Sequence, residues 1–158
     1  MKPRVNYVES GKGAMNAMLT FSGYVAKSGL EHSLINLIDF RVSQINGCAY
    51  CLDMHSKDLR AAGETEQRLY LLDAWRESPM YTDRERAALE WAEAVTLITQ
   101  GHVPDEVYER VRAQFSEEEL INLTMAVVAI NSWNRLNIAL RTVPGTYRPA
   151  TAHSAAQF

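Results

Sequence analysis

The chain has 158 residues, of which 47% are hydrophobic and 22% charged, and its formal net charge is −3. This length predicts a single domain over residues 1–158, with a core over about 15–140 and a tail over 141–158. The balanced charge, without any basic run, argues against nucleic acid or an anionic membrane surface as a partner.

Two stretches bear on the cellular compartment. The first 18 residues lack the apolar core of a signal peptide. The most hydrophobic stretch, residues 120–140, is interrupted by asparagine and arginine. Such polar residues are costly in a bilayer, so we interpret the stretch as a helix buried within the protein. We therefore expect a cytoplasmic protein, whose thiols are kept reduced.

Helical patterns dominate the first half of the chain. Apolar residues recur at helical spacing over 15–25 and over 34–45, which predicts two helices that end near Gly29 and at Gly47. A third helix is expected to begin at or just before Cys48 and to stop at Gly63. A short helix then follows, capped by Thr65 and ended by Pro79.

Two capping boxes mark helices in the second half. Thr82 with Glu85, and Ser116 with Glu119, have the Ser/Thr-x-x-Glu spacing of helix starts. Pro104 suits the first turn of a short helix between them. Strand-like alternation is not evident, so we predict an all-α domain, a bundle of about six or seven helices. The tail after residue 144 is expected to wrap a surface or to be mobile.

The stretch INGCAYCLDMHSKDLRAAGE, residues 45–64, holds both cysteines. Cys48 and Cys51 are three residues apart, and His55 follows four residues later, so all three side chains fall on one helix face. A helix N-terminus favours thiolate over thiol. A histidine one turn further on can accept the thiol proton or pair with the thiolate. The pattern predicts a redox-active dithiol.

Other interpretations of the cysteine pair are weaker. A structural disulfide would close so short a loop that it would stabilise little, and a buried or accidental pair has no need of this spacing. Zinc prefers four ligands, and this stretch supplies three at most. The chain also lacks a glycine-rich phosphate loop, so we expect no metal and no cofactor. From the residues alone, Cys48 would be the better nucleophile, because it lies nearer the helix start.

The longer segment INGCAYCLDMHSKDLRAAGETEQRL resembles the Cys-x-x-Cys-x-x-x-His signature of the alkylhydroperoxidase D-like branch of the carboxymuconolactone decarboxylase family. TDRERAALEWAEAVTLI and AINSWNRLNIAL are similar to later helices of that family. The resemblance covers about residues 15–140. It implies an all-helical fold whose protomers assemble through helix faces, and we expect a homo-oligomer, with a hexamer favoured.

The resemblance also implies peroxidase chemistry. Cys51, paired with His55, would attack an organic hydroperoxide and become a sulfenic acid, and Cys48 would then condense with it. A dithiol donor, such as a lipoyl group or a thioredoxin-like protein, would restore the reduced pair. Two rivals remain: a dithiol redox sensor or assembly protein without efficient turnover, and a decarboxylase or lactone-processing enzyme of the wider family.

Two positions depart from the family pattern. Asn36 stands where the family has a glutamate twelve residues before the first cysteine, and Tyr50 stands where some members have a histidine. Asp39, one turn further along, could supply the missing carboxylate. We treat Asn36 and Asp39 as a possible proton relay and expect the relay to be broken rather than taken over by Asp39.

Three asparagines, at positions 131, 134 and 137, recur at helical spacing near the end of the long apolar stretch. Buried amides need hydrogen-bond partners. We expect these three to cap neighbouring helices or to contact another protomer, rather than to line a substrate channel.

Overall fold

The computed structural model describes residues 2–149, and within them it contains eight α-helices, two short 3-10 helices and no strand. The all-α prediction is confirmed, although the predicted number of helices was slightly low. In chain order the elements are α1 (Tyr7–Ser10), α2 (Lys12–Ala26), α3 (His32–Asn46), α4 (Ala49–Ala61), α5 (Glu66–Leu71), η1 (Leu72–Glu77), α6 (Asp83–Thr96), η2 (Ile98–Gln100), α7 (Asp105–Arg112) and α8 (Glu117–Leu140). The sequence pattern missed α1, because four residues are too few to establish a helical period.

The predicted helix starts depend on their capping residues. Both capping boxes form: the hydroxyls of Thr82 and Ser116 each accept a hydrogen bond from a backbone N–H of the first turn, and the glutamate three residues later accepts one from the cap's own N–H. Thr65 caps α5 in the same way through its side chain. Gly47 ends α3 with a φ of 68°, a left-handed conformation that favours glycine. Local chemistry therefore sets most of these boundaries.

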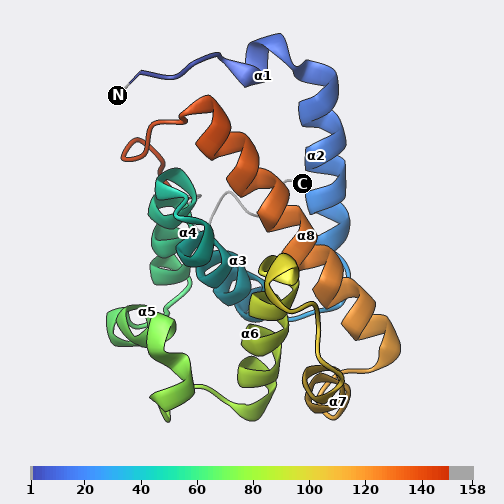
Figure 1. Cartoon of the computed structure of the whole chain (residues 1–158). Helices are drawn as coiled ribbons and strands as arrows, with labels where there is room; N and C mark the ends of the chain where they lie inside the picture. The colour runs from blue at the N-terminus through green and yellow to red at the C-terminus, as the bar shows by residue number, and fades with distance from the viewer. Residues whose placement is uncertain (1, 150–158) are drawn as a thin grey trace.

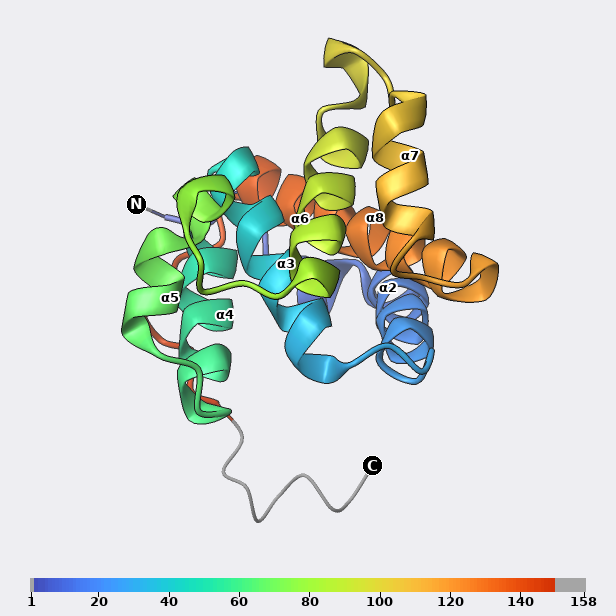
Figure 2. The same ribbon diagram turned by 90° about the horizontal axis from the view of Figure 1, so that it is seen from below.

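Helix α3 is the centre of the fold and packs against α4, α6 and α8 (Figure 1). Ile38 and Val42 of α3 are fully buried against Leu123 and Val127 of α8 in the same apolar core. Helix α2 lies along α8, and α6 and α7 lie side by side (Figure 2). In the part of the chain that the structure describes, no helix combines the length and apolar character needed to cross a membrane.

A buried charge cluster fixes α3 against α6 and η1. The Arg41 guanidinium donates from Nε to Glu93 at 2.8 Å and also contacts the Asp73 carboxylate. Glu93 accepts further hydrogen bonds from the indole N–H of Trp75 at 2.9 Å and from Arg76 at 2.5 Å. Arg41 and Glu93 are buried, and this is tolerated because each is paired and hydrogen-bonded, whereas Asp73 and Arg76 contact them from the exposed surface.

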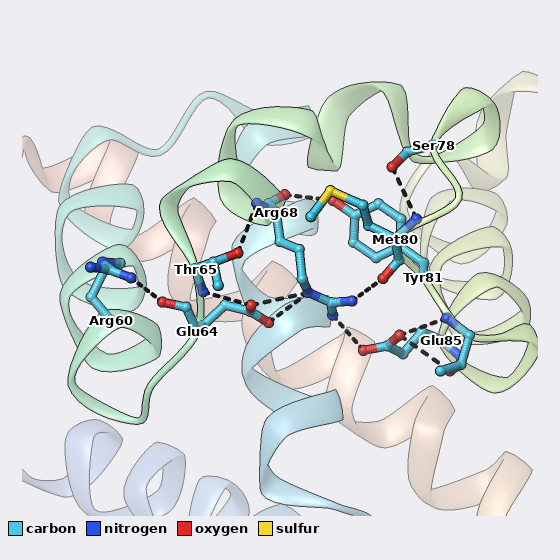
Figure 3. A network of polar contacts seen from close by, with 9 residues as sticks. Arg60, Glu64, Thr65, Arg68, Ser78, Met80, Tyr81 and Glu85 are labelled. Atoms are coloured by element: carbon cyan, nitrogen blue, oxygen red, sulfur yellow. Dashed lines mark hydrogen bonds and ion pairs between the residues drawn. The ribbon is translucent and has the colours of Figure 1, made fainter.

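A second polar network joins the end of α4 to α5 and α6 (Figure 3). At its centre Arg68 donates to Glu64 at 3.0 Å, to Glu85 at 2.6 Å and to the Met80 carbonyl. The Tyr81 hydroxyl donates to the Arg68 carbonyl oxygen. Because one guanidinium contacts Glu64, just after α4, and Met80, after η1, the network holds the far end of the cysteine-bearing helix.

The chain after α8 follows the surface of α4. The Gly145 N–H donates to Asp53 at 2.9 Å, and the Tyr147 hydroxyl donates to Asp58 at 2.7 Å. Lys57 donates to the Tyr147 carbonyl oxygen at 3.2 Å. Within the described chain the tail contacts α4 as far as Tyr147, which fits one of the two expectations for it; residues 150–158 of the predicted tail lie outside the described part of the chain.

Candidate active site

The turn between α3 and α4 places the two cysteines. Left-handed Gly47 reverses the chain, and Cys48 becomes the N-cap of α4, with its Sγ accepting the Cys51 N–H at 3.4 Å. The two side chains are joined as a disulfide, their Cα atoms 5.3 Å apart, and each residue is 1% exposed. The cysteine pair at this helix start therefore does form a disulfide.

A cavity of about 500 Å³ lies beside the disulfide. Cys51 and His55 of α4 line it, and so do Asn36 and Asp39 of α3, whereas Cys48 does not. Helices far apart in the sequence complete the wall, which is largely apolar; its apolar side chains are those of Val8, Met15, Leu19, Val25, Ala26, Ile35, Met54, Ala126, Ala129, Ile130 and Trp133. Four of the five predicted site residues thus meet at one cavity, and Cys51 is the sulfur that faces it.

Burial sets the protonation of the two titratable groups beside Cys51. Desolvation lowers the pKa of His55 to about 4 and raises the pKa of Asp39 to about 8. At neutral pH the imidazole is therefore uncharged and the carboxyl group holds a proton. Neither ring nitrogen of His55 has a hydrogen-bond partner in the described structure, although the ring is buried. A neutral, unpartnered imidazole has a free lone pair that can take a proton, but burial disfavours its charged form, so a proton that it accepts is readily passed on.

The two candidate relay residues differ in their relation to His55. The Asp39 Oδ2 atom lies 4.0 Å from His55 Nδ1, slightly beyond direct hydrogen-bond distance and close enough for one intervening water. Asn36 lines the same cavity one turn earlier on α3, and its side chain makes no hydrogen bond within residues 2–149. Tyr50, between the cysteines, also lines the cavity, and its hydroxyl has a raised pKa because of burial.

Two residues at the cavity were not identified from the sequence. The Asn137 Nδ2 atom lies 3.5 Å from the Cys51 sulfur, and the Tyr7 hydroxyl donates to Asn137 Oδ1 at 3.0 Å. Of the roles weighed for Asn137 from the sequence, lining a channel fits its position better than the favoured one of capping a helix or contacting another protomer. The regular spacing of the three asparagines placed Asn137 one turn beyond Asn134. It could not show which face of α8 packs against α4, because that depends on the tertiary structure. Tyr7 gave no signal, because it precedes every predicted helix.

The other two asparagines join helices, as expected. Asn46 of α3 donates to Asn131 at 3.0 Å and to Asn134 at 2.9 Å. Asn131 in turn donates to Thr96 of α6 at 3.0 Å, and Asn134 donates to Ser43 of α3 at 3.0 Å. These amides satisfy one another in the α3–α6–α8 contact and leave Asn137 as the member that faces the dithiol.

Neither a metal nor a cationic anchor is evident in the described structure. Across residues 2–149, no three histidine, cysteine, aspartate or glutamate side chains are grouped to hold a metal ion. Over the same residues, no lysine or arginine lines the cavity. The site beside the dithiol thus consists of a disulfide, the buried neutral imidazole of His55, a protonated carboxyl group and amides, and the exposed His32 lines the same largely apolar cavity at the start of α3.

An all-α fold with a Cys-x-x-Cys disulfide at a helix start and a histidine one turn later defines the class of protein. The chain belongs to the carboxymuconolactone decarboxylase family, whose model matches residues 12–94, and to its alkylhydroperoxidase D-like branch. It is 46% identical to the uncharacterized protein YdfG of Bacillus subtilis over 140 residues, which cover 89% of this chain and 95% of that one.

Two further relatives place the chain within this branch. The crystal structure of ATU0492 from Agrobacterium tumefaciens matches with a TM-score of 0.89 and 46% identity, over 92% of this chain and 100% of that chain. ATU0492 is a protein of unknown function for which an AhpD-type antioxidant defence role has been suggested. The alkyl hydroperoxide reductase AhpD of Mycobacteroides abscessus is 42% identical over a shorter segment of 45 residues, 28% of this chain and 26% of that one.

Proposed function

We propose that this protein is a cytoplasmic thiol-dependent peroxidase that reduces organic hydroperoxides through the Cys48–Cys51 dithiol. The observation that carries the proposal is the position of Cys51, which lines the apolar cavity together with His55 while Cys48 lies behind it. A nucleophilic sulfur needs both access to substrate and a base within reach. Cys51 lines the cavity and shares it with His55, one turn further along α4, whereas Cys48 does not line it, which supports Cys51 as the attacking residue.

In the proposed reaction the reduced Cys51 transfers its proton to His55, and the thiolate attacks the terminal oxygen of the hydroperoxide. The O–O bond breaks, the sulfur is oxidised to a sulfenic acid, and the peroxide is reduced to an alkoxide that takes a proton and leaves as an alcohol. His55 passes the Cys51 proton on to the alkoxide, and protonated Asp39, 4.0 Å from His55, is placed to exchange a proton with the imidazole in this relay, so that both groups end in their starting protonation states.

Cys48 resolves the intermediate. Its thiol attacks the Cys51 sulfenic acid, forms the disulfide and releases water, which requires no large movement because the bonded pair already fits the start of α4. An external dithiol, either a lipoyl group or a thioredoxin-like protein, then reduces the disulfide and is itself oxidised. The cytoplasm is the compartment in which such donors are kept reduced.

The charge of the cavity favours uncharged hydroperoxides and argues against the lactone-processing and decarboxylating alternatives. Carboxylate-bearing substrates of those enzymes need a cation to offset desolvation. Among the described residues that line this cavity there is no lysine or arginine. A buried carboxyl group such as Asp39 would repel a substrate carboxylate further if it were ionised. An alkyl or aryl hydroperoxide without a formal charge avoids both penalties.

Self-association forms part of the proposal. Large apolar side chains remain exposed on the two helices that flank the cavity: Leu19 at 59% and Tyr24 at 55% on α2, and Ile121 at 63% and Ile138 at 45% on α8. A second copy of the chain is the partner that the family resemblance implies for such faces. We propose a homo-oligomer, with a hexamer favoured.

The test is steady-state turnover. Purified protein is supplied with cumene hydroperoxide and excess dihydrolipoamide, and alcohol production is followed for many equivalents, with Cys51→Ser as the inactive control. Sustained turnover that Cys51→Ser abolishes supports the peroxidase. Oxidation that stops after one equivalent, even with reductant present, would instead identify a redox sensor. Conversion of a carboxylated lactone by both proteins would identify the wider family's chemistry.

A further inference from the structure

The mechanism above does not use Asn137, although its amide nitrogen lies nearer to the Cys51 sulfur than any other side-chain donor recorded for residues 2–149. Asn137 is on α8, 86 residues from Cys51 in the sequence, and it is 5% exposed. We propose that Asn137 is a catalytic residue that hydrogen-bonds the Cys51 thiolate, and that Tyr7 is the positioning residue that orients its amide. The proposal rests on the proposed function in taking Cys51 as the attacking sulfur.

The orientation of the Asn137 amide is determined by its neighbours. Its Nδ2 atom lies 2.9 Å from the Trp133 carbonyl oxygen, which can only accept a hydrogen bond. A flipped amide would set two acceptors against each other at this distance, so the nitrogen must face Trp133 and Cys51. One N–H is used by the Trp133 carbonyl, and the other points at the sulfur, 3.5 Å away.

Tyr7 supports this orientation from the other side. Its hydroxyl donates to Asn137 Oδ1 at 3.0 Å, so the amide carbonyl is occupied and polarised away from the sulfur. The segment that carries Tyr7 is itself anchored to α8, because the Arg4 N–H donates to the Leu140 carbonyl oxygen at 2.9 Å. The amide is therefore held by contacts at both of its ends before the sulfur becomes charged.

The Cys51 thiolate has need of such a donor. Burial disfavours a positive charge on the histidine beside it, and no lysine or arginine of the described chain lines the cavity. The Cys51 N–H is already directed at the Cys48 sulfur. A thiolate is a much stronger acceptor than a sulfur in a disulfide, so the contact with Asn137 gains strength when the protein is reduced. A preoriented N–H is what the anion requires in a site poor in water.

The test measures the thiol without any peroxide. In the Cys48→Ser background, where Cys51 is the sole cysteine, the rate of alkylation by iodoacetamide as a function of pH gives the Cys51 pKa. Asn137→Ala should raise this pKa by about one unit and slow alkylation at neutral pH by about tenfold. Asn137→Asp should raise it further, because it sets an anion against the thiolate. Tyr7→Phe should raise it by a smaller amount.

The chain contains a matched control for this pair. The Tyr24 hydroxyl of α2 donates to Oδ1 of Asn122, another buried asparagine of α8, at 2.9 Å, and neither residue lines the cavity. Asn122→Ala and Tyr24→Phe should leave the Cys51 pKa unchanged, although they remove the same kind of hydrogen bond. If Asn137→Ala and Asn137→Asp both keep the parental pKa, the assignment is wrong.

The outcomes separate this inference from the proposed function. A raised pKa in the Asn137 variants of a protein that turns over no hydroperoxide would leave the thiolate contact standing and overturn the peroxidase. Normal hydroperoxide turnover with an unchanged Cys51 pKa in all variants would support the peroxidase and overturn the thiolate contact. Should Asn137→Ala fail to fold, Tyr7→Phe carries the test alone, because Tyr7 lies on the four-residue α1, where no residue is buried: an unchanged pKa in that variant would then reject the proposal.

Discussion

His55 Nδ1 lies 4.0 Å from Asp39 Oδ2, although the two residues belong to different helices and are 16 positions apart. Both side chains are largely buried, at 9% and 18% exposure. Burial favours the uncharged form of each group, so the pair stores one proton, on the carboxyl group, near neutral pH. The arrangement gives the histidine an acidic neighbour without the glutamate that the family has at position 36.

Substitution at positions 36 and 39 decides which residue serves the relay. The close approach of Asp39 to His55 favours Asp39 over a broken relay. We therefore predict that Asp39→Asn lowers kcat for cumene hydroperoxide by about 10²-fold, within the usual range for a positioned acid or base. Asn36→Glu should change turnover little. A tenfold gain from Asn36→Glu, with Asp39→Asn neutral, would show instead that the relay is broken in the natural protein.

The pH dependence of stability should report the Asp39 proton. Burial raises the Asp39 pKa from 3.8 to about 8, so over this range the folded protein holds a proton that the unfolded chain has released. Stability therefore falls as pH rises. His55, whose pKa is lowered from 6.5 to about 4, acts in the opposite sense between those values, when the unfolded chain holds the additional proton.

The two effects oppose each other up to about pH 6.5, and only the Asp39 contribution remains from there to about pH 8. We predict that the free energy of unfolding of the oxidised protein falls by about 1–2 kcal/mol in this window. Urea unfolding at pH 6.5 and pH 8, at one protein concentration, measures it. Asp39→Asn should remove most of the decline; an equal decline in both proteins would contradict the assignment.

The two cysteines should give different products with peroxide. Cys51→Ser should consume no hydroperoxide. Cys48→Ser should complete one round of oxidation and stop at a sulfenic acid on Cys51, which excess peroxide converts to a sulfinic acid. Mass spectrometry after one equivalent of peroxide distinguishes these species, and in the natural protein it should show the Cys48–Cys51 disulfide. A sulfenic acid on Cys48 in the Cys51→Ser protein would reverse the roles.

The buried charge cluster should carry a large share of the stability of the α3–α6 contact. Glu93→Gln leaves the buried Arg41 guanidinium without its main counter-charge, and we predict a loss of about 3 kcal/mol in the free energy of unfolding. Glu90→Gln is the matched control. Glu90 is on α6, as Glu93 is, but it pairs with the exposed Arg110 of α7. Denaturant titration should show a lower unfolding midpoint for Glu93→Gln than for the natural protein. The midpoint of Glu90→Gln should be almost unchanged.

Self-association should be visible by light scattering. We predict a mass several times that of the 17.8 kDa chain at micromolar concentration, with a hexamer favoured. Ile121→Asp, on the exposed face of α8, should lower the mass, whereas Tyr70→Asp, on exposed α5, should not. A mass of one chain for the unmodified protein would remove the oligomer from the proposal.

The sequence alone determined the features that depend on local chemistry. Capping boxes at Thr82 and Ser116 set two helix starts, and Gly47 set the end of the helix before the dithiol, because caps and left-handed glycines act within one or two turns. Cys48 and Cys51 needed only the first turn of one helix to come together. The all-α fold and the redox pair were therefore predictable from short-range pattern.

Only the tertiary structure decided what surrounds that pair. Residue spacing cannot say which face of α8 turns toward α4, so the Asn137 contact with Cys51 was not predicted. Nor can it give the distance between Asp39 and His55, which depends on how α3 and α4 pack. The same packing removes water from both groups and shifts their protonation in opposite directions. Long-range packing thus sets the protonation of the groups beside the dithiol and brings the Asn137 amide to the Cys51 sulfur.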